Sequence, residues 1–313
     1  MTPERAARLE ASGAATERVE TIDGYLERLR AELAGSDPAL VQDALGSAEE
    51  YLRSEQAELA ARGESIAEAE LVQRTLERFG TPREVAEAYR DSERRRLQPG
   101  PFPVPERRRD DLFWQIFGVV VDPRAYGALL YMFLALATGV LSFTWAVTGL
   151  ALSIGLLPLI IGVFVPILFL ASLRGFAVLE GRIVEALLGV RMPRRGPAPA
   201  PGRLLARAKG WLKDGRTWST LLYMLLQMPL GILYFTLFTV ILSLTLGIAL
   251  APIAQAVLGV PTILIGRYSV ELSLAMLPLV WIAAAFDLLL ALHLARALGR
   301  LHGRYAKAML VRP

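Results

Sequence analysis

Two long stretches of this chain contain no Asp, Glu, Lys or Arg. They run from residue 125 to residue 173 and from residue 217 to residue 266. Because about 20 apolar residues suffice for a helix to cross a bilayer, each stretch is too long to be one ordinary span. The pattern predicts four membrane spans, near residues 125–149, 154–173, 218–243 and 273–294.

Residues 18–96 follow a different pattern, with apolar residues at helical spacing among charged ones. This spacing predicts a compact domain of short helices. Residues that cap helices or end them punctuate the pattern. The predicted starts are Asp37-Pro38, Ser65 with Glu68, and Thr81-Pro82 with Glu84, and the predicted ends are Gly35, Gly63 and Gly80.

The apolar half contains an internal repeat. A shift of 92 residues lays Tyr131 on Tyr223 and gives 11 identities in the 23 positions of residues 122–144. Further along, a shift of 122 lays Arg174 on Arg296 and Arg182 on Arg304. The change of shift locates an insertion of about 30 residues, at roughly 247–272, in the second copy. Both copies have the same orientation, which predicts a parallel duplication of a two-span hairpin.

These patterns predict an all-α protein in which a small soluble helical domain precedes a four-helix membrane domain. The predicted parts are a flexible N-terminus (1–17), a helical domain (18–96), a linker rich in Pro and Arg (97–111), membrane repeat 1 (112–192), a Pro-rich linker (193–203) and membrane repeat 2 (204–313).

Charge is distributed unevenly along the chain. Residues 1–90 carry 19 acidic and 11 basic side chains, whereas residues 112–313 carry 6 acidic and 17 basic ones. The arginines lie at the ends of apolar runs, so they indicate membrane orientation and predict no direct nucleic-acid binding. Both termini and the segment between the repeats are expected in the cytoplasm. The predominance of Arg over Lys is typical of a high-GC bacterium, which places the expected location in its cytoplasmic membrane.

The same orientation places the 247–272 insertion on the outer side. There it could be a lid, an interfacial helix or a shallow re-entrant segment. Its main polar residues are candidate contacts for an external ligand, and an amphipathic segment lying on the outer leaflet would have the same pattern. These candidates are Gln255, Arg267, Tyr268 and Glu271.

Asp287 is the only acidic residue inside a predicted span. Counted at 1.5 Å per residue, it shares a layer of the inner leaflet with Tyr131, Tyr223 and Gln227. Because a carboxyl in a bilayer is costly, these four residues are a candidate polar site for a ligand or for coupling between helices. The alternative is a protonated Asp287 that simply bonds a neighbouring span.

Arginines continue past the ends of the spans, at Arg174, Arg182, Arg296 and Arg304. They are expected to set orientation and contact lipid headgroups, and they could also dock the acidic N-terminal domain.

No motif for enzyme chemistry, metal binding or cofactor binding is visible. The chain has no cysteine and two histidines, His293 and His302, without a carboxylate partner between them. We expect both histidines to be solvated at the membrane interface. The sequence therefore predicts a protein that is not an enzyme and uses no cofactor.

Residues 18–96 resemble the HAAS-type signalling domain of bacterial membrane proteins. The resemblance rests on Tyr25-Leu26, on Glu49-Glu50-Tyr51-Leu52, in which Tyr51 stands where relatives commonly have histidine, and on Phe79-Gly80-Thr81-Pro82. Residues 112–313 are similar to an actinobacterial-type sensor domain, through Asp214-Gly215-Arg216-Thr217-Trp218, Pro229-Leu230-Gly231 and Leu187-Leu188-Gly189-Val190.

Both resemblances imply signalling, and neither supplies catalytic residues. The leading hypothesis is a membrane sensor or regulator that relays an envelope or lipid-phase signal to a cytoplasmic partner. By resemblance, that partner would be a PadR-type regulator or a histidine kinase system. The alternative is a small permease or lipid-handling protein with its site around Asp287. Under either hypothesis membrane lipids are expected partners. The sequence leaves open whether the chain forms a homo-oligomer.

Overall fold

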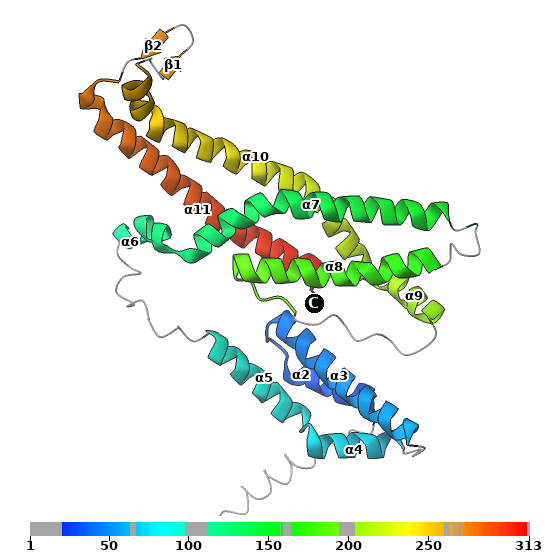
Figure 1. The fold of residues 1–313 in the computed structure, drawn as a ribbon. Helices are drawn as coiled ribbons and strands as arrows, with labels where there is room; N and C mark the ends of the chain where they lie inside the picture. The colour runs from blue at the N-terminus through cyan, green and yellow to red at the C-terminus, as the bar shows by residue number, and fades with distance from the viewer. Residues whose placement is uncertain are drawn as a thin grey trace, which may run out of the picture. The chain divides into compact units, whose positions relative to one another are not determined.

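The computed structural model describes residues 21–62, 67–97, 112–156, 158, 164–193, 204–259, 263–265, 268–270 and 272–311 (Figure 1). These residues are almost entirely helical, as the sequence predicts, with one short β-hairpin. The chain divides into two compact units, an N-terminal one and a larger apolar one. Each is described by itself.

The N-terminal unit contains α2 (Ile22–Glu32), α3 (Pro38–Ala61), α4 (Glu68–Arg78) and α5 (Pro82–Leu97). Its core is formed by apolar residues that recur at helical spacing on facing sides of these helices. They are Tyr25, Leu29, Leu33, Leu40, Ala44, Ala48, Leu52, Val72, Val85 and Ala86. Burial of this stripe holds the four helices together, because packing of an apolar face supplies most of the stability of such helices.

Two of the three predicted helix starts are confirmed. Asp37 accepts a hydrogen bond from the Ala39 amide at 2.8 Å, and the Glu84 carboxylate accepts one from the Thr81 amide at 2.8 Å. The third is wrong, because α4 begins at Glu68 and not at Ser65, which lies outside the described residues. The Glu68 carboxylate instead accepts a hydrogen bond from the Ile22 amide at 2.9 Å, so a contact with α2 takes the place of a local cap.

Four helices of the second unit are long and apolar enough to cross a membrane. They are α7 (Pro123–Gly155), α8 (Phe164–Leu188), α10 (Gly215–Leu258) and α11 (Leu277–Leu310). The number of candidate membrane helices agrees with the predicted number of spans. All four helices end later than predicted, whereas α8 and α11 begin later than the predicted spans, at Phe164 and Leu277 instead of residues 154 and 273. At 1.5 Å per residue, α10 is about 66 Å long, roughly twice the thickness of a hydrocarbon core.

The helices α7 and α10 cross at two glycines, where their backbones come into contact. A Cβ atom at Gly139 would lie 2.7 Å from the Gln227 carbonyl oxygen, and one at Gly231 would overlap the Ala135 carbonyl oxygen. Neither site has room for a side chain. Such close approach of two apolar helices is typical of small residues at membrane helix interfaces.

A short helix precedes each of the long helices α7 and α10. The helix α6 (Leu112–Phe117) and a 3-10 turn lead into α7, and α9 (Leu204–Lys213) leads into α10. Asp122 caps α7 by accepting a hydrogen bond from the Arg124 amide at 3.0 Å, and Asp214 caps α10 in the same way, from the Arg216 amide at 3.1 Å.

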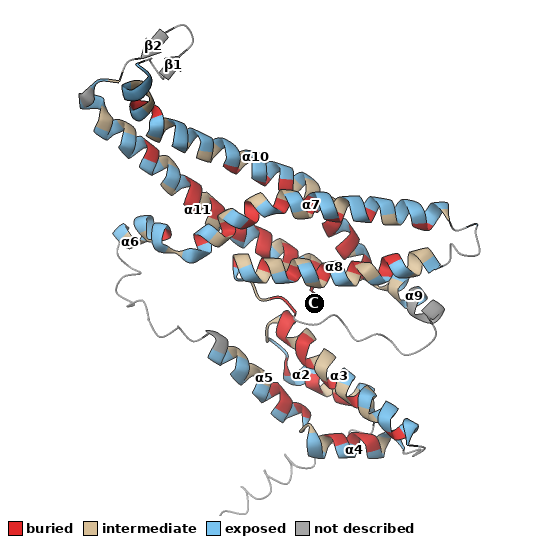
Figure 2. Cartoon of the chain, viewed as in Figure 1, coloured by how far each residue is buried: buried red, intermediate tan, exposed pale blue. Residues whose placement is uncertain are grey.

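The 247–272 insertion is a helix extension followed by a hairpin. Its first residues continue α10 as far as Leu258, where Gly259 ends the helix with a φ of +64°. The strands β1 (Ile263–Ile265) and β2 (Tyr268–Val270) then pair antiparallel. Figure 2 shows mainly exposed residues along the part of α10 that leads to this hairpin. The sequence patterns did not predict this strand pair.

Candidate functional site

A cluster of polar side chains is buried where α7, α8, α10 and α11 meet. The hydroxyl of Tyr131 lies 2.9 Å from Glu180 Oε1 and 2.6 Å from His302 Nε2. The hydroxyl of Tyr223 makes the same two contacts, at 3.1 and 3.2 Å. Two tyrosines from α7 and α10 therefore bridge a carboxyl group on α8 and an imidazole on α11.

Two further residues of α10 complete this cluster, which we call the Glu180–His302 cluster. The Gln227 amide nitrogen donates to Tyr131 Oη at 3.1 Å and to Glu180 Oε1 at 3.2 Å. The hydroxyl of Tyr234 lies 3.3 Å from His302 Nδ1. Both imidazole nitrogens and one carboxylate oxygen thus have hydrogen-bond partners.

Burial makes these bonds important for stability. Tyr131 is 0% exposed, Tyr223 and His302 are each 1% exposed, and Glu180 is half-buried. Inside a protein a polar group left without a partner costs about 1–3 kcal/mol, and a charged group costs more. The network compensates Glu180 with three donors, since Tyr131, Tyr223 and Gln227 all point to Oε1.

The expectation that His302 is solvated at an interface is wrong, because it is the buried centre of this cluster. It is also surrounded by aromatic rings, with the centroid of Tyr131 at 4.9 Å and that of Tyr305 at 5.6 Å. His293 differs, since its Nε2 lies 2.9 Å from the Ile116 carbonyl oxygen in an exposed contact.

The structure brings together three of the four residues of the predicted intramembrane site and places Asp287 elsewhere. Tyr131, Tyr223 and Gln227 belong to the Glu180–His302 cluster, whereas Asp287 accepts a hydrogen bond from Thr245 at 2.6 Å. The estimate of depth from residue counts treated the helices as parallel, whereas α7 and α10 cross. The tyrosines consequently meet α11 at His302, which is 15 residues, or about 22 Å, from Asp287 along that helix.

Of the predicted outer-face ligand contacts, the structure describes the side chain of Gln255. Its amide forms two hydrogen bonds with the backbone of Leu272, accepting from the N–H at 2.8 Å and donating to the C=O at 3.1 Å. These bonds tie the end of α10 to the start of the α11 segment. Arg267, Glu271 and the side chain of Tyr268 lie outside the described residues.

The basic residues past the spans fall into two groups. Arg174 lies 3.9 Å from the Asp214 carboxylate and 4.7 Å from the ring centroid of Trp211, and Arg296 lies 3.4 Å from the Asp122 carboxylate. Two arginines thus bind the aspartates that cap α10 and α7. The other two basic residues, Arg182 and Arg304, are exposed.

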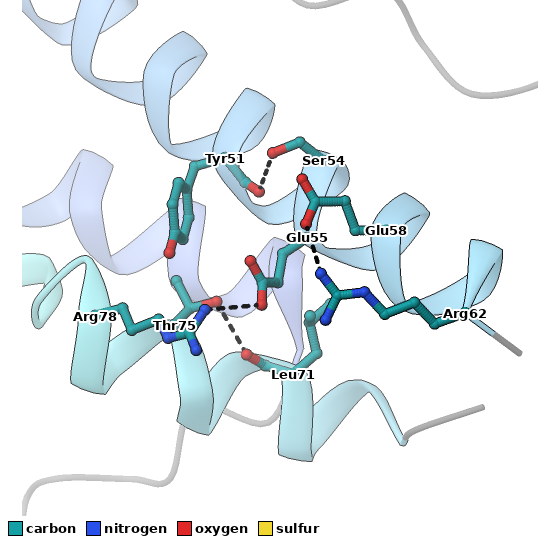
Figure 3. Close-up of polar contacts among 8 residues, drawn as sticks. All are labelled: Tyr51, Ser54, Glu55, Glu58, Arg62, Leu71, Thr75 and Arg78. Carbon is teal, nitrogen blue, oxygen red and sulfur yellow. Dashed lines mark hydrogen bonds and ion pairs between the residues drawn. The ribbon is translucent and has the colours of Figure 1, made fainter. Parts of the chain in front are cut away.

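In the N-terminal unit, polar contacts connect the end of α3 with α4 (Figure 3). Glu55 and Arg78 form an ion pair at 3.5 Å, and the ring of Tyr51 stacks on Phe79 with centroids 4.8 Å apart. On the other side of Phe79-Gly80, the Tyr25 hydroxyl donates to the Gly80 carbonyl at 2.8 Å. The turn between α4 and α5 is therefore held by aromatic residues from both α2 and α3.

Two protein families match this chain. A family model described as "Putative sensor" matches residues 131–310, more than half of the chain. The chain belongs to this sensor family. A second model, HAAS, matches residues 24–88. No curated protein and no solved structure matches the chain.

The sensor-family region begins at Tyr131 and includes every residue of the Glu180–His302 cluster. The HAAS match includes Tyr25, Tyr51 and the Gly80 turn. Both predicted resemblances are confirmed, with the sensor match starting 19 residues later than the predicted domain.

Three residues of the Glu180–His302 cluster, Glu180, His302 and Tyr234, were not predicted as site residues. Glu180 lies beyond the predicted end of the second span, at residue 173, whereas α8 continues to Leu188. One sequence signal could have found Glu180 and His302. The shift of 122 that aligns Arg174 with Arg296 also lays Glu180 on His302, so the two residues occupy corresponding positions of the repeat.

Proposed function

We propose that this chain is an integral membrane sensory or regulatory protein that relays an envelope or lipid-phase signal to a cytoplasmic partner through its HAAS domain. The observation that carries the proposal is the presence of a sensor-family region and a HAAS domain in one chain, together with four helices suited to cross a membrane. The proposal assigns no reaction to the chain, because neither resemblance transfers catalytic residues to it.

The proposed membrane domain consists of two parallel repeats that pack against each other about a pseudo-two-fold axis. Two ion pairs between the repeats support this. Asp122 of the first repeat pairs with Arg296 of the second, and Asp214 of the second pairs with Arg174 of the first. Under the shifts of 92 and 122, these are the same pair of positions with the partners exchanged.

The glycines of the helix crossing support the same arrangement. Gly139 packs on the backbone of Gln227, and Gly231 packs on that of Ala135. Both contacts correspond under the shift of 92, so each copy of the motif uses the other as its partner.

In the proposed orientation, both termini lie in the cytoplasm of a bacterium and the β1–β2 hairpin lies outside. The support is the excess of basic residues in the segments that precede, separate and follow the two hairpins. A HAAS domain in the cytoplasm can reach a PadR-type regulator or a histidine kinase system, the partner classes that the resemblances imply.

Crosslinking with the full chain in its native membrane tests the relay. A photo-crosslinking amino acid at Gln56, an exposed position of α3, is expected to capture a cytoplasmic regulator or kinase. The same amino acid at Ser269 of the hairpin is the matched control and should capture no cytoplasmic protein. Repeated failure to capture any signalling protein from exposed HAAS positions would refute the relay.

The transport alternative depends on Asp287. Its carboxyl lies in a candidate span and is costly there, which is the observation in its favour. A permease that uses this site should lose flux in proteoliposomes when Asp287 is replaced by Asn. A parent protein without flux would exclude the alternative.

A further inference from the structure

The hydrogen bonds of the Glu180–His302 cluster form a continuous chain. It runs from Glu180 through Tyr131 to His302 and from there to Tyr234, with separations of 2.9, 2.6 and 3.3 Å. Every side chain in this hydrogen-bond path can both donate and accept a proton, because a carboxylic acid, a phenol and an imidazole each offer a donor and an acceptor. The chain of contacts is therefore a candidate path for a proton.

With an ionised Glu180, only one direction of these hydrogen bonds satisfies all the groups. Tyr131 must donate to the carboxylate, so His302 has to donate from Nε2 to Tyr131, and Tyr234 donates to Nδ1. His302 is then neutral, with its proton on Nε2. All three bonds point toward Glu180.

With a protonated Glu180, the same contacts are satisfied in the reverse direction. The carboxylic acid donates to Tyr131, Tyr131 donates to His302 Nε2, and Nδ1–H donates to Tyr234. The reversal adds one proton in total. Glu180 gains it, both tyrosines keep theirs, and His302 stays neutral with its proton on Nδ1 instead of Nε2.

We propose that the Glu180–His302 cluster is a proton-binding site, in which protonation of Glu180 reverses the hydrogen bonds through Tyr131 and His302. The proton site itself does not depend on the relay proposed above. Its use as a sensor does rest on the proposed function, and pH would then be the signal that the protein relays. The ligand is a proton, and its binding residues come from all four long helices.

Proton binding should change how these helices pack. The ionised carboxylate accepts three charge-assisted hydrogen bonds from α7 and α10, and such bonds are roughly twice as strong as neutral ones. Protonation removes that charge and weakens the hold of α7 and α10 on α8. Acidification is therefore expected to loosen α8 within the bundle.

The groups that face the cluster do not supply a competing charge. The titratable ones are Tyr131 on α7, Tyr223 and Tyr234 on α10, and Tyr305 on α11, whose ring stacks on Tyr223 with centroids 5.3 Å apart. The ion pairs of Arg174 and Arg296 lie six residues, or about 9 Å, along α8 and α11 from Glu180 and His302. Glu180 is the group of the cluster whose charge changes in this scheme, because His302 is neutral in both arrangements.

Histidine NMR tests the reversal directly. The chain has two histidines, so a His293→Gln chain with ¹⁵N-labelled histidine reports on His302 alone. In nanodiscs of neutral lipid, the proton should lie on Nε2 at about pH 8 and on Nδ1 at about pH 5, with a neutral ring at both. A single tautomer over the whole range, or an imidazolium ring at low pH, would overturn the proposal.

Distance measurements test the change in packing. The chain has no cysteine, so spin labels at Leu179→Cys and Leu301→Cys, on exposed positions of α8 and α11, report only on these two helices. The parent distance distribution should widen on acidification, and Glu180→Gln should abolish this response. Asp287→Asn is the control and should retain it.

If the Glu180→Gln chain does not fold, the histidine NMR experiment still decides the question, because it is done on a chain that retains Glu180. A tautomer change without captured partners would support the proton site and reject the relay. Captured partners without a tautomer change would do the opposite.

Discussion

At the scale of single residues, Tyr25 shows how one hydroxyl holds a turn of the HAAS domain. The side chain is 0% exposed, and its hydroxyl donates to the carbonyl of Gly80, a residue with a φ of +101°. Burial raises the pKa of the Tyr25 phenol from its ordinary value of 10.0 to about 12, and the nearby Glu84 carboxylate adds to the rise.

Replacement of Tyr25 by Phe should destabilise the HAAS domain by about 1 kcal/mol, because the Gly80 carbonyl loses its partner in the core. Native-state hydrogen exchange of residues 22–88 in the full chain measures the change. Tyr89→Phe is the matched control, since the Tyr89 hydroxyl makes no hydrogen bond within the described part of the chain. Equal effects of the two substitutions would contradict the role of this bond.

The raised pKa of Tyr25 also gives a pH dependence. A phenol with a higher pKa in the folded state contributes stability that is fully present below pH 10 and is lost as the pH rises from 10 to about 12. The difference in phenolate absorbance between the parent and the Tyr25→Phe chain should therefore titrate near pH 12. A titration near pH 10 would show that the phenol is not buried as described.

At the scale of elements, the crossing of α7 and α10 depends on the absence of side chains at two positions. A Cβ at Gly231 would overlap the Ala135 carbonyl oxygen, and a backbone atom cannot move aside as the end of a flexible side chain can. The helices would have to separate to accept even one methyl group.

Gly231→Ala should therefore lower the stability of the membrane domain by about 1–3 kcal/mol. Gly247→Ala is the matched control in the same helix, since nothing lies within 4 Å of a Cβ there and alanine favours helix by up to about 1 kcal/mol. Thermal unfolding in detergent, followed by tryptophan fluorescence, should separate the two variants. If both were equally stable, the helices would not be in contact at Gly231.

The element boundaries show which signals in the sequence are local. The cap at Asp37 and the reciprocal cap of Thr81 and Glu84 were predicted correctly because each needs only neighbours in the chain. The start of α4 was not, because Glu68 bonds the backbone of Ile22, 46 residues away. A capping motif is a reliable predictor only where no tertiary partner competes for the same carboxylate.

At the scale of the whole molecule, the proposed relay depends on the orientation of the four candidate spans. In the proposed orientation, two hairpins that begin and end on the same side would place the HAAS domain and the C-terminus on one face of the membrane. The β1–β2 hairpin, which follows α10 and precedes α11, would then lie on the opposite face.

Single cysteines test this orientation cleanly, because the parent chain has none. In intact cells, a membrane-impermeant thiol reagent should label Ser269→Cys in β2 and leave Gln56→Cys in α3 unlabelled. Permeabilised cells should show both labelled. Labelling of Gln56→Cys in intact cells would place the HAAS domain outside and exclude a cytoplasmic partner.

The sequence by itself determined the class of this protein. Long apolar segments predict four candidate spans, because a bilayer tolerates few charges along a spanning helix, and periodic apolar residues predict the small helical domain. The internal repeat and the family resemblances are likewise properties of the residues alone.

Only the tertiary structure decided which polar residues meet. Tyr131 and His302 are 171 positions apart, and Tyr131 and Glu180 are 49 apart. Counting residues from the end of a span gives the position of a side chain along its own helix. Which positions of different helices lie side by side depends on the angle at which α7 and α10 cross. That crossing brings His302 to the buried cluster and leaves Asp287 with Thr245.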